Sequence, residues 1–168
     1  MILQGDIKIN GQHYPKGSYI SPWKVYPFFI FHMGMFGGSG FIMAYFSDVS
    51  PGFLYLHGGF AILIYLLFYK TIFGIDEVKW MFINALLGIL GLYSEIGTLL
   101  SWAGKDINSF PLHIHIIPFL YYILYTFLFR QIFIEVTNSR EDRDKKERVS
   151  YVYLIVSTLV YLFLYIVN

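Results

Sequence analysis

The sequence predicts an all-α integral membrane protein, a bundle of five transmembrane helices with a small N-terminal β-hairpin on the cytoplasmic side. Of the 168 residues, 57 % are hydrophobic and 14 % are charged, whereas a soluble domain is about 45–50 % apolar and about 25 % charged. Eleven of the 23 charged residues lie between positions 130 and 148. The remaining 149 residues therefore carry too few charges to coat a globular surface. Five apolar stretches approach the roughly 20 residues that a spanning helix needs.

This composition excludes a soluble enzyme, a nucleic-acid-binding protein and a disordered chain. The absence of cysteine excludes disulfides, a thiolate nucleophile, an iron–sulfur cluster and a thiolate zinc site. The first six residues lack the basic stretch and apolar run of a cleaved signal peptide. Insertion into a membrane is therefore expected to rely on the internal helices.

Residues 1–25 are expected to form a cytoplasmic segment, separate from the transmembrane domain of residues 26–168. Residues 6–9 alternate between polar and apolar, and Asn10-Gly11 is a preferred pair for a tight hairpin turn. Residues 12–14 are expected to return as the second strand. Because an isolated two-stranded hairpin is marginally stable, it should lean on the bundle or on a partner.

The five expected spans are separated by short connections that contain glycine, proline, serine and acidic residues. Short connections place consecutive helices antiparallel to one another, as in a bundle. The connection at about 134–148 is longer and highly charged, and its residues 140–148 are expected to form a solvated cytoplasmic loop or helix extension. The expected spans are residues 26–46, 53–73, 78–102, 112–133 and 149–167.

The basic residues predict the orientation in the membrane. Eleven of the twelve lysines and arginines lie on the side that contains the N-terminus, and Lys105 alone lies on the other side. Cytoplasmic loops are enriched in basic residues. The sequence therefore predicts a multi-pass protein of the cell membrane with a cytoplasmic N-terminus and an outer C-terminus.

The histidines and the carboxylate inside the spans are the main indication of function, because ionisable side chains are costly within a bilayer. At 1.5 Å per residue, Glu95 lies roughly 10 Å below the outer end of the third span, and the histidines of the second and fourth spans lie within about 6 Å of theirs. His32 in the first span lies near the inner side, where a structural role is expected. The residues predicted to converge on the outer leaflet are Asp48, His57, Glu95, His113 and His115.

Imidazole and carboxylate groups suit a divalent metal such as copper, zinc or iron, so these five residues are the predicted metal ligands. Alternatively, His57 with His113 or His115 suits the two axial positions of a single b-type haem. His113 and His115 are separated by about 200° in an ideal helix. Pro111 and Pro118 are expected to distort this stretch, so that both rings turn inward or divide ligand and supporting roles.

Glycines offer two interpretations of the first span. Gly37-Gly38-Ser39-Gly40, with His57 in the second span, allows a Ser–His dyad. The favoured alternative is that the small residues, with Gly34, form a close helix-packing face. Gly88 and Gly91 lie one turn apart and predict that the third helix is central.

The predicted function is therefore a small membrane protein that binds a metal or one haem at its outer side. A quinone is the natural lipid-soluble partner if the protein is redox-active. One alternative is a non-catalytic accessory subunit of a larger membrane complex, and another is a small proton-coupled transporter. The same residues could also form a polar packing or proton-handling cluster. No catalytic residue is assigned, and no nucleic-acid partner is expected.

Overall fold

The computed structural model describes residues 1–9 and 11–167, and five of its helical stretches are long and apolar enough to cross a membrane. With the two-stranded sheet at the N-terminus, this confirms the five apolar helices and the hairpin of the predicted fold. The helices are α1 (Pro22–Tyr45), α2 (Pro51–Phe73), α3 (Ile75–Gly91), α4 (Gly97–Trp102), α5 (Ile116–Val136) and α6 (Arg143–Val167). A π-helical turn, Leu92–Ile96, joins α3 to α4, and a 3₁₀ turn, Leu112–His115, precedes α5.

Four of the five long helices begin earlier than the apolar pattern predicts, whereas α5 begins later, at Ile116. Pro22 and Pro51 are the first residues of α1 and α2, because proline lacks the N–H that a first helical turn leaves unpaired. The Ser50 hydroxyl caps α2 by accepting from the backbone N–H of Phe53. α6 begins at Arg143, so residues 143–148 of the charged stretch are helical, whereas residues 140–142 precede the helix.

The N-terminal hairpin consists of β1 (Ile7–Ile9) and β2 (Gln12–Tyr14), paired antiparallel with Ile7 opposite Tyr14. Asn10 of the predicted turn lies outside the described residues, and Gly11 has a φ of 81°. The segment before the hairpin leans on the bundle, because the Gln4 backbone N–H donates to the Thr71 carbonyl at 2.9 Å. The expected support by the bundle is therefore present.

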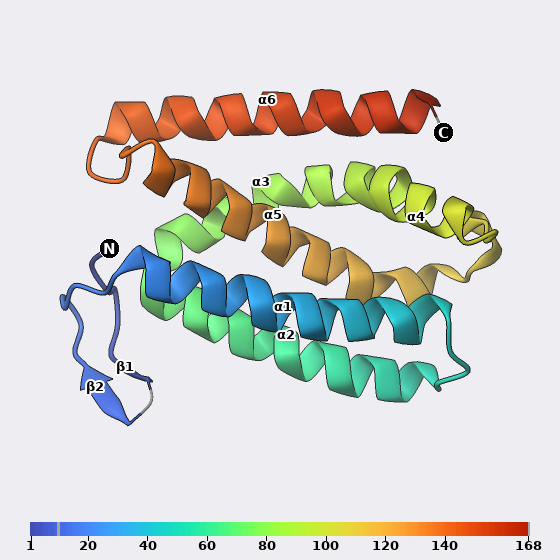
Figure 1. Cartoon of the computed structure of the whole chain (residues 1–168), viewed down its shortest axis with the longest axis horizontal. Helices are drawn as coiled ribbons and strands as arrows, with labels where there is room; N and C mark the ends of the chain where they lie inside the picture. Colours follow the sequence, from blue (N-terminus) through green and yellow to red (C-terminus); the bar gives the residue numbers. More distant parts are fainter. Residues whose placement is uncertain (10, 168) are drawn as a thin grey trace.

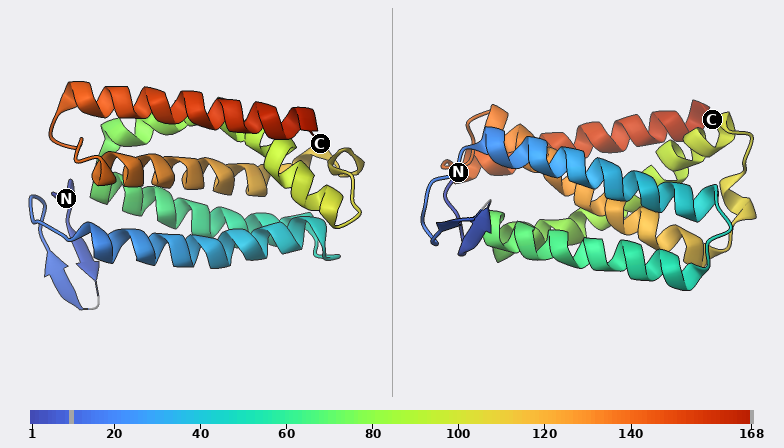
Figure 2. Two further views of the ribbon diagram at one scale, coloured as in Figure 1. Left: turned by 45° about the horizontal axis from the view of Figure 1, so that its top comes forward. Right: turned by 60° about the horizontal axis from the view of Figure 1, so that its bottom comes forward.

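The helices form three layers, with α1 and α2 on one side, α3 and α5 in the middle, and α6 on the other side (Figure 1; Figure 2). The N-terminus lies at the end that carries the hairpin, here called the hairpin end, and the C-terminus lies at the opposite end, called the far end. α5 contacts α1, α2, α3 and α6. α3, the predicted central helix, contacts α2, α5 and α6 and shares the middle layer with α5.

Most of the predicted glycine faces are packing faces. A Cβ at Gly37 would lie 3.3 Å from the Tyr125 ring, and one at Gly88 would lie 2.9 Å from the Phe119 ring. A Cβ at Gly91 would overlap the Tyr122 ring. Gly38 is an exception, since a Cβ there would meet nothing within 4 Å. The absence of side chains lets α1 and α3 approach the tyrosines of α5 closely.

A buried ion-pair network ties the helices together at the hairpin end. The Arg130 side chain is 1 % exposed, and its guanidinium donates to the Glu77 carboxylate at 2.9 Å and to the Ser150 hydroxyl at 3.0 Å. Lys146 donates to the other Glu77 oxygen at 2.8 Å. The guanidinium also lies 4.4 Å from the ring centroid of Trp80. α3, α5 and α6 therefore meet at one buried cation and its carboxylate.

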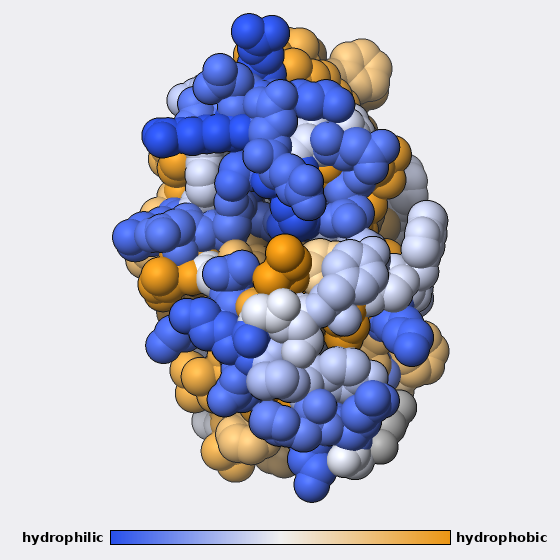
Figure 3. Space-filling model, turned by 90° about the vertical axis from the view of Figure 1, so that its left-hand side faces the viewer, coloured by the Kyte–Doolittle hydropathy of each residue, from blue (hydrophilic) through white to orange (hydrophobic). Residues whose placement is uncertain are grey.

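Arg140 extends this network toward α1. It pairs with Glu135 at 2.7 Å and donates to the Tyr26 hydroxyl at 2.9 Å. The Tyr26 hydroxyl donates to the Gln131 carbonyl, and the Gln131 amide donates to Glu77. Hydrophilic residues cover much of the hairpin end, while hydrophobic residues appear mainly around its margins (Figure 3). This distribution separates a polar end from the apolar sides of the bundle.

Replacing Glu77 should destabilise the fold strongly. Glu77→Gln leaves the buried Arg130 without its counter-ion, and breaking a buried pair costs about 3–5 kcal/mol. The matched control is Asp76→Asn, because the Asp76–Lys79 pair is exposed and such pairs contribute about 0–1 kcal/mol. Denaturant unfolding in detergent micelles, followed by tryptophan fluorescence, measures both. Equal losses in the two variants would contradict the structural role of the network.

Candidate functional site

The predicted outer-side residues lie in separate places, and His57 is the first example. His57 is half-buried on the side of α2 that faces α1, where its Nε2 lies 3.2 Å from the Ser39 Oγ. Two positions earlier, the Tyr55 hydroxyl donates to the His113 carbonyl. Since two residues differ by about 200° around a helix, the His57 ring points away from His113.

The two histidines before α5 also diverge. His115 is buried, and its Nδ1 lies 2.8 Å from the Tyr45 hydroxyl. His113 and Asp48 are exposed. The predicted irregularity of this stretch is present as the 3₁₀ turn, but two positions in a 3₁₀ helix differ by about 240°. The turn therefore buries one imidazole and leaves the other on the surface.

Glu95 faces a third direction, toward α5 and α6, where its Oε2 accepts from the Tyr122 hydroxyl at 2.9 Å. Within residues 1–9 and 11–167, no three histidine, aspartate or glutamate side chains are grouped so that they could hold a metal ion. The positions of His57 and His115 likewise do not fit the two axial sites of one haem. Metal or haem binding stays a prediction that this arrangement does not support.

The structure does bring Ser39 and His57 together, as the dyad hypothesis requires. The Ser39 hydroxyl donates its single proton to the Phe36 carbonyl at 2.9 Å, which makes His57 the donor in the contact with Ser39. An activated nucleophile needs the opposite arrangement, with the imidazole accepting the serine proton. The contact therefore joins α1 to α2 and does not activate Ser39.

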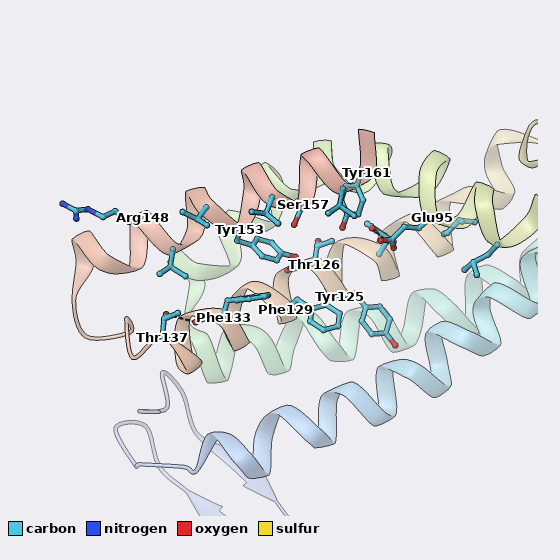
Figure 4. Close-up of a pocket in the computed structure, with 17 residues that line it drawn as sticks. Glu95, Tyr125, Thr126, Phe129, Phe133, Thr137, Arg148, Tyr153, Ser157 and Tyr161 are labelled. Atoms are coloured by element: carbon cyan, nitrogen blue, oxygen red, sulfur yellow. Dashed lines mark hydrogen bonds between the residues drawn. The ribbon is translucent and has the colours of Figure 1, made fainter. Parts of the chain in front are cut away.

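The most distinctive hollow is an apolar groove of about 740 Å³ between α5 and α6, with Glu95 inside it (Figure 4). Arg148 and Thr137 lie at its hairpin end, and Glu95 lies toward the far end. Glu95 and Arg148 are the charged residues among those that line it. Its walls are apolar and include Ile96, Leu99, Phe129, Phe133, Val152 and Val156.

Local backbone structure places Glu95 at this groove. Glu95 lies in the π-helical turn, Leu92–Ile96, and such single turns occur frequently at functional sites. Gly91 precedes the turn and lets the Tyr122 ring lie against the α3 backbone. The Tyr122 hydroxyl thereby reaches the carboxylate one turn further along the helix.

The groove remains open because α6 packs loosely on the bundle. Ser150 and Tyr161 are the buried residues of α6. Its contacts with the bundle are largely polar or aromatic, including the bond from the Tyr153 hydroxyl to the Thr126 carbonyl at 2.9 Å and the Tyr122–Tyr161 ring contact at 5.9 Å. Bulky tyrosines at intervals hold the helix away from α5, which leaves apolar space between them.

Glu95 was predictable as a site residue from its position within a span, whereas the side chains around it were not predicted. Tyr153, Ser157 and Tyr161 recur every four residues on α6, so they share one face of that helix. That spacing was the available signal, although the tyrosine-rich composition of the chain obscured it. The ion pair between Arg130 and Glu77 was not predicted either. Arg130 lies at the end of a span, where a basic residue indicates only the orientation of the helix in the membrane.

A lipid-soluble carbodiimide should modify Glu95. Dicyclohexylcarbodiimide partitions into apolar surroundings and couples to protonated carboxyl groups, so the groove offers it a path to this side chain. Ser157→Trp should fill the groove and prevent most of the coupling. Leu159→Trp is the matched control, since Leu159 is 61 % exposed on another face of α6. Peptide mass spectrometry measures the yield, and equal coupling in both variants would show that the groove is not the path.

Comparison with protein-family models, curated proteins and solved structures found no match to this chain. The features of this chain that indicate a function are therefore the apolar groove, the single carboxylate that lines it and the tyrosine bonded to that carboxylate.

Proposed function

We propose that this chain is a multi-pass protein of the cell membrane that binds a lipid-soluble molecule with a hydroxyl group in the groove between α5 and α6. The observation that carries the proposal is the Glu95 carboxylate in an otherwise apolar groove between helices long enough to cross a membrane. A carboxylate in such surroundings is costly unless hydrogen bonds satisfy it. A functional role accounts for its presence.

The bonding of Glu95 favours a ligand that donates a hydrogen bond. Tyr122 satisfies Oε2, whereas no bond from the described residues reaches Oε1. A ligand hydroxyl at Oε1 would complete the shell of this carboxylate. Hydrogen bonds to charged groups contribute about 1.5–3 kcal/mol, so this one contact would orient the ligand as well as strengthen its binding.

The dimensions of the groove favour a quinol. Its volume lies within the range of about 300–1,000 Å³ that is usual for small-molecule sites. The distance along α6 from Arg148 to Tyr161 is about 20 Å at 1.5 Å per residue, which suits an isoprenoid or alkyl tail. Tyr122, Tyr153 and Tyr161 offer aromatic surfaces beside the ligand ring. The proposal concerns binding and assigns no redox step to the protein.

Decylubiquinol should bind the purified protein in lipid nanodiscs with a saturable stoichiometry of about one per chain. Glu95→Gln removes the charged acceptor and should weaken binding about tenfold, since 1.4 kcal/mol corresponds to one factor of ten. Ser39→Ala, in the contact between α1 and α2, serves as the control and should bind like the parent. Chromatographic quantification of retained quinol, with empty nanodiscs subtracted, gives the result. Binding no greater than in empty nanodiscs, or unchanged in Glu95→Gln, would refute the proposal.

The proposed orientation places the hairpin end in the cytoplasm, because eleven of the twelve basic residues belong to that side. The absence of native cysteine makes single-cysteine variants unambiguous. A membrane-impermeant maleimide applied to intact cells should label Asn108→Cys at the far end. His13→Cys in β2 should be labelled only after the cells are permeabilised. The reverse labelling pattern would show that the orientation is inverted.

A further inference from the structure

A row of hydroxyl groups follows the inner face of α6 along the groove. Tyr153, Ser157 and Tyr161 are spaced four residues apart, and all three line the hollow (Figure 4). Residues at this spacing are neighbours on one face of a helix. The other α6 residues that line the groove are mainly valines, at positions 149, 152, 156 and 160. An apolar wall is thus interrupted by hydroxyls at regular intervals.

This row connects Glu95 with the mouth of the groove at the hairpin end. At the far side, the Tyr161 and Tyr122 ring centroids are 5.9 Å apart, and the Tyr122 hydroxyl bonds Glu95 at 2.9 Å. At the near side, Arg148 and Thr137 line the mouth. The polar groups therefore extend from the polar end of the bundle to its one groove-lining carboxylate.

We propose that this row conducts a proton between water at the hairpin end and the Glu95 carboxyl. Successive hydroxyl-bearing residues on α6 are about 6 Å apart along the axis, so one bridging water fits between neighbours. A water between two neighbours of the row would bond both of their hydroxyls, the polar partners that it needs in an otherwise apolar groove. In the structure the Tyr153 hydroxyl donates to the Thr126 carbonyl, so it turns from that carbonyl toward Ser157 when it passes its proton on. Each hydroxyl then accepts one proton and passes on its own, so one proton reaches Glu95 and every hydroxyl is left unchanged.

The surroundings of Glu95 are consistent with this path. The tyrosines that line the groove with it are Tyr122 and Tyr125 from α5 and Tyr153 and Tyr161 from α6, while Ile96 and Leu99 on its own side are apolar. Arg148 is the charged group at the opposite end of the lining. The inference concerns the unliganded protein, so it does not depend on the identity of the bound molecule.

Deuterium exchange of the Glu95 carboxyl tests the path directly. Infrared spectra of nanodisc samples, recorded over a series of acidic pD values, should contain a carboxylic C=O band that Glu95→Gln removes. On transfer into deuterated buffer, this band should shift about tenfold more slowly in Ser157→Ala and in Tyr153→Phe, because each variant loses one hydrogen-bonding link. No quinol is added, so failure of this test is distinguishable from failure of the binding proposal.

Thr158→Ala is the matched control, because it removes a hydroxyl from the same helix at a residue that does not line the groove. It should exchange at the parental rate. Carbodiimide coupling to Glu95 checks that the groove is intact in each variant. Parental exchange in both Ser157→Ala and Tyr153→Phe, or the absence of any Glu95-dependent band, would overturn the proton path.

Discussion

The buried Arg130 guanidinium is the group on which the position of α6 depends. Its bonds reach Glu77 at the start of α3 and Ser150 near the start of α6, and Lys146 joins the same carboxylate. A charge that is 1 % exposed is tolerated only when it is paired and hydrogen-bonded. The ion pair therefore specifies how α3, α5 and α6 meet. Its contribution is to the arrangement of the helices, because well-packed apolar residues in place of both partners can give equal stability.

The groove follows from the way in which α6 is attached. The ion pairs anchor its first turns, and the Tyr153 bond to the Thr126 carbonyl and the Tyr161 ring hold the remainder. Between these contacts, the small side chains of Ser157 and the neighbouring valines leave space against α5. A leucine-rich face would have closed that space by interdigitation. α6 is therefore held by a few large or charged residues, and the small residues between them leave the apolar groove open.

The predictable part of the fold was its helices, since length and hydropathy locate them without knowledge of their neighbours. The hairpin was also predictable, because alternation in residues 6–9 and the Asn10-Gly11 pair are local signals. The directions in which His57, His113 and His115 point were not predictable. The position of a residue along a spanning helix gives its depth in the membrane, but not the side of the helix on which it lies. Nothing local predicts the π-helical turn at Leu92–Ile96. The predicted site residues thus lie toward the far end of the bundle, but they do not come together in the single metal or haem site that was predicted.

The position of Glu95 depends more on the backbone around it than on its own side chain. Gly91 gives Tyr122 access to the α3 backbone, and the π-helical turn carries Glu95 to the groove wall. A side chain at position 91 would displace Tyr122 and leave the carboxylate without its donor. An apolar residue at position 95 would relieve the cost of a carboxylate in this groove, yet it would also remove the one strong acceptor there. Gly91, the π-helical turn and Tyr122 thus hold one hydrogen-bonded carboxylate in an apolar groove, and both the proposed ligand and the proposed proton path depend on that arrangement.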